Sequence, residues 1–329
     1  MGGAAVRLLG RYPMRSNSEL IYAKIEVGIA LDGNPLVSLF QLAAMELGSN
    51  ILKHGGGGQG ELWLLEEQGD YFVVALDRGP GIANVTLALK GGYSTYHTPS
   101  LGIGLSSLAR QDGFSLQIVT LTSKKIHGTV VLFGPQRPSA ELYYLSLPFD
   151  PRGNGDFFER KGHLLLFGDA AGHGRLARQT ADFVRERFRA ELRSFLLVDE
   201  WFGRLHHQLQ ERQMRPVELA VIALDRTQVA VAGVGSLTLW YPEGGSYRPL
   251  GLRSGSIGEV IGKFSFLELE RRQPIFLTTD GILSEAIPPF LPQLDQRHVL
   301  AWICALLFFC GSLSDDASLL MIMGEPDES

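Results

Sequence analysis

The chain has 329 residues, of which 45% are hydrophobic and 20% charged, and its formal net charge is −5. This length allows two domains with full cores, and the composition is that of an ordinary soluble globular protein. The negative charge gives no general reason to expect nucleic acid or an anionic membrane as a partner. Cys304 and Cys310 lie in one apolar run, so neither a disulfide framework nor a zinc site is expected, and a reducing compartment is the default.

The most apolar stretch, VLAWICALLFFC at 299–310, is a dozen residues long. A membrane span needs ~20 residues, so this stretch predicts a buried helix instead. The residues before Arg11 contain no hydrophobic core of a signal peptide. We therefore expect a cytoplasmic protein that does not bind a membrane.

The first half begins with a predicted helix at 36–53, where apolar residues recur with a helical period. Glu46 and Asn50 are four residues apart and share a second face of this helix. A glycine-rich loop, HGGGGQG, follows it. Two alternating apolar runs, ELWLLEE and DYFVVALD, then predict a hairpin that turns at Gln68-Gly69.

The hairpin ends in Asp77-Arg-Gly-Pro-Gly81. An Asp followed by Gly79 and Gly81 can accept a hydrogen bond from a flat ligand while the backbone approaches it closely. Further on, Gly102 and Gly104 precede a short helix, and the free N–H groups of such a helix start favour phosphate oxygens. A last strand follows His127-Gly-Thr129.

The order and spacing of these four motifs resemble the ATP-binding domain of the GHKL superfamily, over roughly residues 15–134. The resemblance implies a Bergerat-type α/β sandwich with helices on one mixed sheet, which binds ATP with Mg2+. It implies that Asn50 holds the Mg2+, that Glu46 is the catalytic base, and that Asp77 binds adenine with help from Thr129. Gly79 and Gly81 would admit the base, and Gly102 and Gly104 would flank the phosphates.

Within that superfamily the compact size is most similar to the RsbT and anti-sigma switch kinases. Such kinases phosphorylate Ser or Thr on a small STAS-domain protein. The loop Pro99-Ser100-Leu101-Gly102 lacks the extra glycines that the superfamily usually places there. We therefore expect this half to bind ATP, whereas kinase activity has weaker support because these glycines are missing.

Residues 135–141 form a polar, proline-bearing stretch that predicts a linker between domains 1–134 and 142–329. In the second half, two predicted strands carry Asp156 and end at Asp169, in the sequence FGDAAGHG. A long amphipathic helix comes next. Asp280 follows another apolar strand, and Asp315 with Asp316 precedes the last one.

These carboxylates could meet at one edge of a sheet sandwich, where they would repel one another and raise each other's pKa unless a cation neutralises them. Oxygen ligands suit Mg2+ or Mn2+, and no grouping of His or Cys points to zinc. Two such ions ~3.5–4 Å apart can bind a phosphoryl group and activate water. The pattern therefore favours metal-assisted hydrolysis of a phosphate ester.

The order of the motifs resembles the PPM superfamily of metal-dependent serine/threonine phosphatases, best its SpoIIE and RsbX branch, over 142–324. This implies an αββα sandwich and a two-metal centre of Mn2+ or Mg2+. The implied ligands are Asp156, Asp169 as the bridging catalytic residue, the carbonyl of Ala170, Asp280 and Asp315. The family usually has Gly at the position of Ala170, and Ala can serve if its φ is negative. Asp316 and His173 are interpreted as structural supports.

The leading hypothesis is a bacterial partner-switching regulator that removes phosphate from Ser or Thr of a STAS-domain or similar protein, with an ATP-binding, kinase-like first half. The main alternative is a nucleotide-dependent scaffold whose phosphatase half has lost turnover, with Ala170 as the clue. An ATPase of the gyrase or chaperone type is disfavoured because no transducer region follows residue 134. A homodimer is left open. Arg175 and Arg178 either attract a phosphoprotein or form a solvated helix face.

Overall fold

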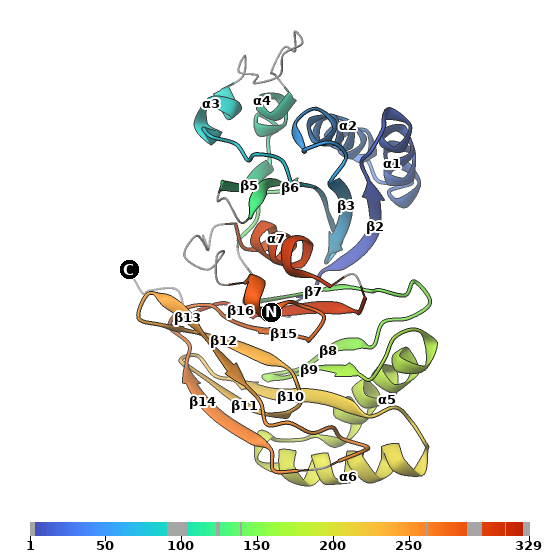
Figure 1. The fold of residues 1–329 in the computed structure, drawn as a ribbon, viewed down its shortest axis with the longest axis vertical. Helices are drawn as coiled ribbons and strands as arrows, with labels where there is room; N and C mark the ends of the chain where they lie inside the picture. The colour runs from blue at the N-terminus through green and yellow to red at the C-terminus, as the bar shows by residue number, and fades with distance from the viewer. Residues whose placement is uncertain are drawn as a thin grey trace. The chain divides into compact units, whose positions relative to one another are not determined.

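The computed structural model describes residues 4–90, 104–122, 126–138, 140–260, 262–287, 298–312 and 314–324. Contacts between residues divide the chain into two compact units (Figure 1). The sandwich unit comprises Met1–Ala5, Ala140–Gln293 and Cys310–Ser329, and the single-sheet unit comprises Val6–Ser139 and Leu294–Phe309. The expected domains 1–134 and 142–329 differ from this division in the first few residues and in 294–309, which belongs with the N-terminal unit.

The single-sheet unit contains five strands in the order β2-β3-β4-β6-β5. All its pairings are antiparallel, so the expectation of a mixed sheet is wrong. The physical reason is that β3/β4 and β5/β6 are hairpins, and a parallel pair would need a crossover connection. The predicted turn of the first hairpin is confirmed, with positive φ at Gln68 and Gly69. The strands are β2 Arg7–Pro13, β3 Gly60–Glu67, β4 Asp70–Asp77, β5 Phe114–Thr122 and β6 His127–Pro135.

One face of this sheet is covered by helices of the same unit. The predicted helix at 36–53 is confirmed as α2, and its buried stripe packs with α1 and with Leu108 of α4 against the sheet. The side chain of Leu20 in α1 packs directly over Gly48 of α2, since a Cβ at Gly48 would lie 2.4 Å from Leu20 Cδ1. The helices are α1 Asn17–Ala30, α2 Val37–His54, α3 Val85–Lys90 and α4 Gly104–Ala109.

The opposite face of the sheet contacts α7, Val299–Cys310, which is the predicted buried helix. The ring of Phe308 packs edge-on against Trp63, with centroids 6.3 Å apart. Arg78 donates a hydrogen bond of 2.9 Å from Nη2 to the carbonyl oxygen of Phe308. Residues far along the chain thus supply a helix for the other face of the sheet. In the described parts of the chain, every helix is too short or too polar to cross a bilayer.

The sandwich unit consists of two sheets, with strand orders β1-β7-β16-β15-β12-β13 and β14-β11-β10-β9-β8. All described pairings are antiparallel except that of the two-residue β1 with β7. The first sheet has β1 Ala4–Ala5, β7 Leu142–Leu147, β12 Thr238–Glu243, β13 Ser246–Gly251, β15 Ile275–Thr278 and β16 Ala317–Ile322. The second has β8 Asp156–Lys161, β9 Leu164–Ala170, β10 Val217–Leu224, β11 Gln228–Val234 and β14 Ser265–Glu270.

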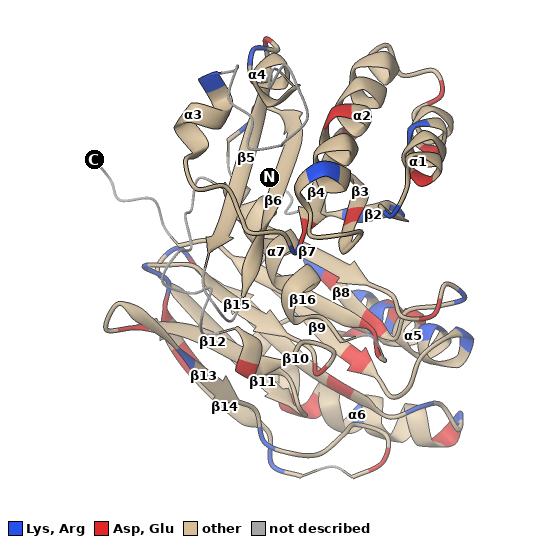
Figure 2. Cartoon of the chain, turned by 45° about the horizontal axis from the view of Figure 1, so that its top comes forward, with Lys and Arg blue, Asp and Glu red and all other residues tan. Residues whose placement is uncertain are grey.

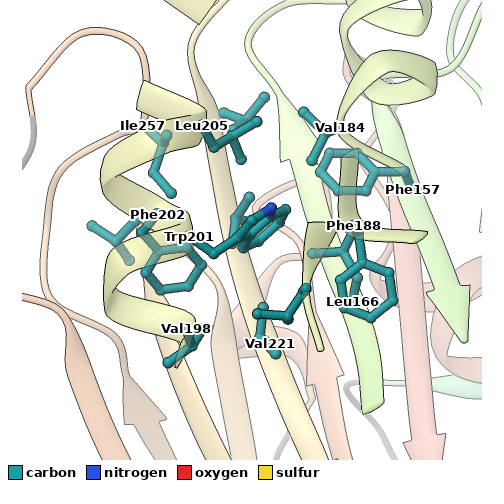
Figure 3. Close-up of a cluster of buried hydrophobic side chains, with 14 of the residues drawn as sticks. Phe157, Leu166, Val184, Phe188, Val198, Trp201, Phe202, Leu205, Val221 and Ile257 are labelled. Carbon is teal, nitrogen blue, oxygen red and sulfur yellow. The ribbon is translucent and has the colours of Figure 1, made fainter. Parts of the chain in front are cut away.

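Strand β9 is apolar at consecutive positions because both of its faces are covered. Leu165 and Phe167 belong to the core between the two sheets. Leu164 and Leu166 point the other way, into a core formed with α5 and α6 (Figure 3). Alternation of side chains along a strand thus gives this sheet two buried faces. The helical segments are α5 Arg175–Glu191, η1 Phe195–Leu197, α6 Val198–Glu211 and η2 Ser284–Ala286.

The α-helices α5 and α6 of the sandwich unit both pack against the same sheet. Among the described residues, that unit has no α-helix for its other sheet, because α7 belongs to the single-sheet unit up to Phe309. The sandwich unit therefore has three layers, one fewer than the expected αββα arrangement.

Candidate metal centre

A row of three carboxylates crosses the second sheet of the sandwich unit. Asp169 on β9 lies directly opposite Asp156 on β8 and directly opposite Glu218 on β10. Side chains opposite one another in neighbouring strands point to the same face. That face is the one between the sheets, because Phe167, two residues before Asp169, is in the inter-sheet core. The strand register therefore gathers three acids at one end of the sandwich.

The facing sheet adds further polar groups at the ends of β15 and β16. Thr279 Oγ1 donates a hydrogen bond of 3.0 Å to Asp156 Oδ2, and the backbone N–H of Ser318 donates one of 3.0 Å to Thr279 Oγ1. This chain of hydrogen bonds fixes the orientation of the Asp156 carboxylate. Asp280 and Asp315 lie beside these residues in sequence, and the charges of both act on Asp169. The structure thus places Asp156 opposite Asp169, and it puts Asp280 and Asp315 near enough for their charges to act on Asp169.

The carboxylates perturb one another strongly. Burial, and then the charges of neighbouring acids, raise the pKa of Asp169 to about 9; these acids are Asp156, Asp280, Asp315 and Glu218. Burial likewise raises the pKa of Asp156 to about 8, with contributions from Asp316 and Asp280. Asp280 is exposed at the surface, yet partial burial and then Asp315 and Glu218 raise its pKa too. Such mutual perturbation is typical of functional sites, where a cation can relieve the repulsion.

The donor set fits a hard divalent cation. Asp156 is 5% exposed, and its Oδ1 is buried without a hydrogen-bond partner in the described part of the chain. Carboxylate oxygens are the ligands that Mg2+ and Mn2+ prefer. In the same described residues, no three Asp, Glu, His or Cys side chains are already close enough to form a metal site. The chemistry of the acids therefore fits a metal, although they do not form a finished cage.

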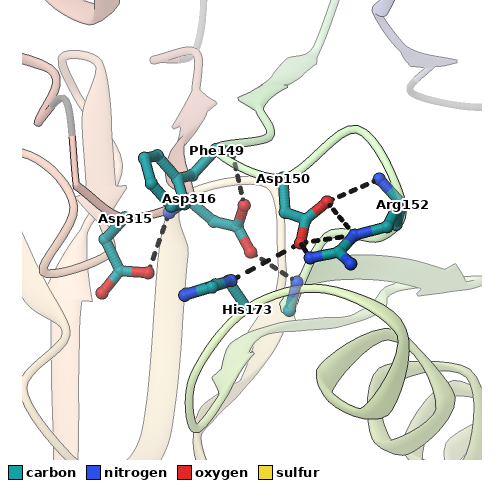
Figure 4. Close-up of polar contacts among 7 residues, drawn as sticks. Phe149, Asp150, Arg152, His173, Asp315 and Asp316 are labelled. Carbon is teal, nitrogen blue, oxygen red and sulfur yellow. Dashed lines mark hydrogen bonds and ion pairs between the residues drawn. The ribbon is translucent and has the colours of Figure 1, made fainter.

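The loop between β7 and β8 is fastened to this cluster by Asp316 (Figure 4). Its Oδ1 accepts a hydrogen bond of 2.7 Å from the N–H of Phe149, and its Oδ2 accepts one of 2.7 Å from the N–H of Gly155. His173 Nδ1 lies 3.7 Å from Asp150 Oδ2, and its ring packs edge-on against Phe149. These contacts fit the supporting role expected for Asp316 and His173.

Ala170 ends β9 with a negative φ, since Gln68 and Gln213 are the only described non-glycine residues with positive φ. Its methyl group is fully buried in the core formed with α5 and α6, on the face opposite Asp169. Its N–H donates a hydrogen bond of 3.1 Å to the carbonyl oxygen of Gly155. The alanine therefore meets the condition stated for it, and its side chain does not enter the acid cluster.

In the single-sheet unit, Asp77 and Thr129 lie opposite each other on β4 and β6. Burial raises the pKa of Asp77, while hydrogen bonds from the N–H groups of Gly79 and Thr129 lower it. A Cβ at Gly79 would lie 2.2 Å from the carbonyl oxygen of His54, and one at Gly81 would lie 2.7 Å from that of Leu121. The space that a side chain would fill at Gly79 and at Gly81 is thus occupied by other parts of the protein's own backbone.

The predicted phosphate-side residues are placed in part. Glu46 on α2 lies against the start of α4, because a Cβ at Gly104 would be 2.3 Å from Glu46 Oε2. Asn50 is one turn further along α2 and is partly buried. Gly102 lies outside the described residues.

The sequence analysis missed two residues of this site. These are Glu218, which lies opposite Asp169, and Thr279, whose hydroxyl donates to Asp156. Glu218 accepts hydrogen bonds from the N–H, at 2.7 Å, and the hydroxyl of Ser236. Its signal was a single charged residue in the otherwise apolar strand VELAVIAL. Thr279 immediately precedes Asp280 and could have been found as a hydroxyl next to a predicted ligand.

A scan against protein-family models gives no match, and a search of curated proteins gives none. Solved structures, serine/threonine phosphatases among them, are similar to just over half of the chain. The SiaA-PP2C domain of Pseudomonas aeruginosa is 20% identical with a TM-score of 0.44, covering 56% of this chain and 85% of that one. RsbX in complex with magnesium is 16% identical with a TM-score of 0.45, covering 56% and 96%.

The serine/threonine phosphatase PstP/Ppp of Mycobacterium tuberculosis is 16% identical with a TM-score of 0.45, covering 56% of this chain and 99% of that one. None of these similarities supports a kinase half. At such low identities and TM-scores, the functional argument depends on the residues of the site.

Proposed function

We propose that the sandwich unit is a metal-dependent protein phosphatase that acts on phosphoserine or phosphothreonine. The observation that carries this proposal is the acid cluster, in which burial and neighbouring carboxylates raise the pKa values of Asp156 and Asp169 to about 8 and about 9. The buried, unpartnered Oδ1 of Asp156 adds an oxygen that is ready to bind a cation.

The residues that would hold the metal ions are Asp156, Asp169, Asp280 and Asp315, with the carbonyl of Ala170. Two bound divalent cations supply electrostatic stabilisation of a phosphoryl group and a water molecule of lowered pKa. The chain's own contribution is orientation: Thr279 fixes one oxygen of Asp156, and Asp316 fixes the loop 149–155 beside it. Ser236 holds Glu218 through its N–H at 2.7 Å.

The test is release of phosphate from phosphoserine peptides by the purified full chain, with and without Mn2+. We expect hydrolysis that depends on Mn2+ and that is lost in Asp169→Asn. A variant of similar size and charge change outside the cluster, Asp199→Asn at the exposed start of α6, serves as the control. Hydrolysis that is equal in wild type and Asp169→Asn would refute the proposal.

For the single-sheet unit we propose ATP binding, supported by Glu46 lying against Gly104 and by Asp77 paired with Thr129. Phosphorylation of a STAS-domain protein, and its dephosphorylation by the sandwich unit, extend this proposal to a partner-switching regulator. Labelled ATP with a STAS-domain substrate tests the kinase step. If neither wild type nor Glu46→Ala gives labelled product, the kinase activity is excluded, and calorimetry then tests ATP binding alone.

The competing scaffold hypothesis predicts ATP binding without turnover in the sandwich unit. Ala170 was its main support, and the placement of the methyl group away from the acids weakens it. The phosphate-release assay separates the two hypotheses, because a scaffold would bind partners without any Mn2+-dependent hydrolysis.

A further inference from the structure

A pocket opens beside the acid cluster at one edge of the sandwich unit. It has a volume of about 340 Å3 and is lined by residues of β7, of the loop and start of β8, and of α5. This edge pocket is defined by Tyr144, Ser146, Asn154, Asp156, Arg178 and Arg185. Its volume is at the lower end of the range for sites that take a small ligand or a single side chain. Asp156 belongs both to this pocket and to the proposed metal centre.

The wall formed by α5 is positively charged. Arg178 and Arg185 are seven residues apart, which is about two helical turns, so both face the pocket. Figure 2 shows several Lys or Arg positions, coloured blue, along this helix. Asp182 is near both guanidinium groups: its Oδ2 is 3.9 Å from Arg178 Nε, and its Oδ1 pairs with Arg185 Nη2. One carboxylate shared by two guanidinium groups leaves an excess of positive charge on this wall.

The other charged groups at the pocket do not cancel that excess. Asp150 also lines the pocket, but its carboxylate accepts hydrogen bonds from Nε and Nη2 of Arg152. The pairing holds the pKa of Asp150 well below its usual range. Asp156 belongs to the proposed metal centre, where bound cations would neutralise its charge. The Arg178 and Arg185 pair therefore dominates the electrostatics of the pocket.

The pocket also offers a donor without a partner. Nε of Arg185 is buried and has no hydrogen-bond partner in the described residues. The hydroxyl of Tyr144 also lines the pocket, but it already interacts with Ser146 and with Ser318, whose Oγ is 3.4 Å away. An anion beside Arg185 would satisfy its Nε.

We propose that the edge pocket binds an acidic side chain of the substrate protein, next to the residue that carries the phosphate. This inference rests on the proposed phosphatase function and adds to it a preference for acidic sequences. The acidic side chain would lie next to the phosphorylated residue because Asp156 both lines the pocket and belongs to the acid cluster. The excess positive charge and the unpartnered Nε select a carboxylate over an amide or an amine.

The test compares two phosphoserine peptides that differ only by Glu or Gln at the positions flanking the phosphoserine. With Mn2+ and the full wild-type chain, we expect kcat/KM to be about tenfold higher for the Glu peptide, mainly through a lower KM, as for a charge-assisted hydrogen bond. In Arg185→Gln the ratio should fall to less than threefold. In the control Arg189→Gln, which changes an exposed arginine of α5 paired with Glu159 outside the pocket, the ratio should stay near tenfold.

Equal kcat/KM for the two peptides in wild type, or a preference that persists in Arg185→Gln, would overturn the inference while leaving the phosphatase proposal intact. Absence of hydrolysis of both peptides would count against the phosphatase proposal. In that case the anisotropy of fluorescent Glu and Gln peptides bound to the full chain decides the inference. Tighter binding of the Glu peptide, lost in Arg185→Gln, supports it, and equal binding refutes it.

Discussion

The two units surround a buried aspartate with different neighbouring groups. In the single-sheet unit, Asp77 is offset by the chain itself, through N–H groups of Gly79 and Thr129 and the charge of His127. In the sandwich unit, the neighbouring charges that act on Asp169 are all acids, and each raises its pKa. Protein groups offset part of the burial of Asp77, whereas Asp169 lies in a cluster that requires protons or cations. Position at a strand end alone does not distinguish these cases, and the neighbours do.

The substitution with the largest expected effect is Asp156→Asn. It preserves the shape of the side chain and removes an oxygen anion from the proposed metal centre. Since loss of a group that merely supports a ligand costs ~10–100-fold, we expect loss of a ligand to lower Mn2+-dependent phosphatase activity by at least ~100-fold. Phosphate release and Mn2+ titration calorimetry measure the effect. Unchanged Mn2+ affinity would show that the acid cluster does not bind the metal.

Asp316→Ala should cause the largest loss of stability. Asp316 is 2% exposed and accepts hydrogen bonds from two backbone N–H groups, those of Phe149 and Gly155. Leaving these donors unpaired costs about 2–4 kcal/mol in the free energy of unfolding of the sandwich unit. Denaturant unfolding measures the loss, and Asp316→Asn, which retains one acceptor, should lose less. Equal stability of the alanine variant and wild type would mean that water replaces the carboxylate.

The metal-free protein should become less stable as pH rises. Both aspartates have an ordinary pKa of 3.8 in the unfolded chain. In the folded state the pKa of Asp156 is raised to about 8 and that of Asp169 to about 9. Between these values the folded state binds more protons than the unfolded state, so the stability present at low pH is lost as pH rises through the folded pKa values. We expect the Tm to fall between pH 5 and pH 9, and Mn2+ to restore it most at high pH. A Tm that rises over that range would contradict the raised pKa values.

Asp77→Asn provides the matched substitution in the single-sheet unit. An asparagine keeps one acceptor but presents an NH2 group to backbone donors that Asp77 now satisfies. Because burial also raises the pKa of Asp77, its contribution to stability falls as pH rises, so we expect the loss of about 1–2 kcal/mol in the variant to shrink with rising pH. In the metal-free sandwich unit, Asp156→Asn should gain stability relative to wild type over the same range, and more steeply, because other acids also act on Asp156. A steeper trend for Asp156→Asn than for Asp77→Asn would confirm the contrast, and equal trends would remove it.

Local patterns in the sequence were sufficient for the elements that carry the site. The apolar runs predicted β9 and α5. The carboxylates at strand ends pointed to Asp156, Asp169, Asp280 and Asp315, whose metal-binding role stays a prediction. Glu218 was missed because its place beside Asp169 depends on the register of β10, which one strand's sequence does not specify. The apolar pattern of α7 predicted a buried helix but not which sheet it would cover, since that depends on contacts more than 200 residues apart, such as Arg78 with Phe308.

The smallest effect is expected for Ala170→Gly, the substitution that restores the residue usual in the PPM superfamily. The methyl group is fully buried in the core with α5 and α6, on the face away from Asp169. Losing one buried methyl group and adding backbone freedom in β9 should cost about 1–2 kcal/mol. Because the methyl does not enter the acid cluster, phosphatase activity should change by less than about threefold, or ~0.7 kcal/mol in the barrier. A large gain of activity would instead show that the alanine suppresses turnover, as the scaffold hypothesis requires.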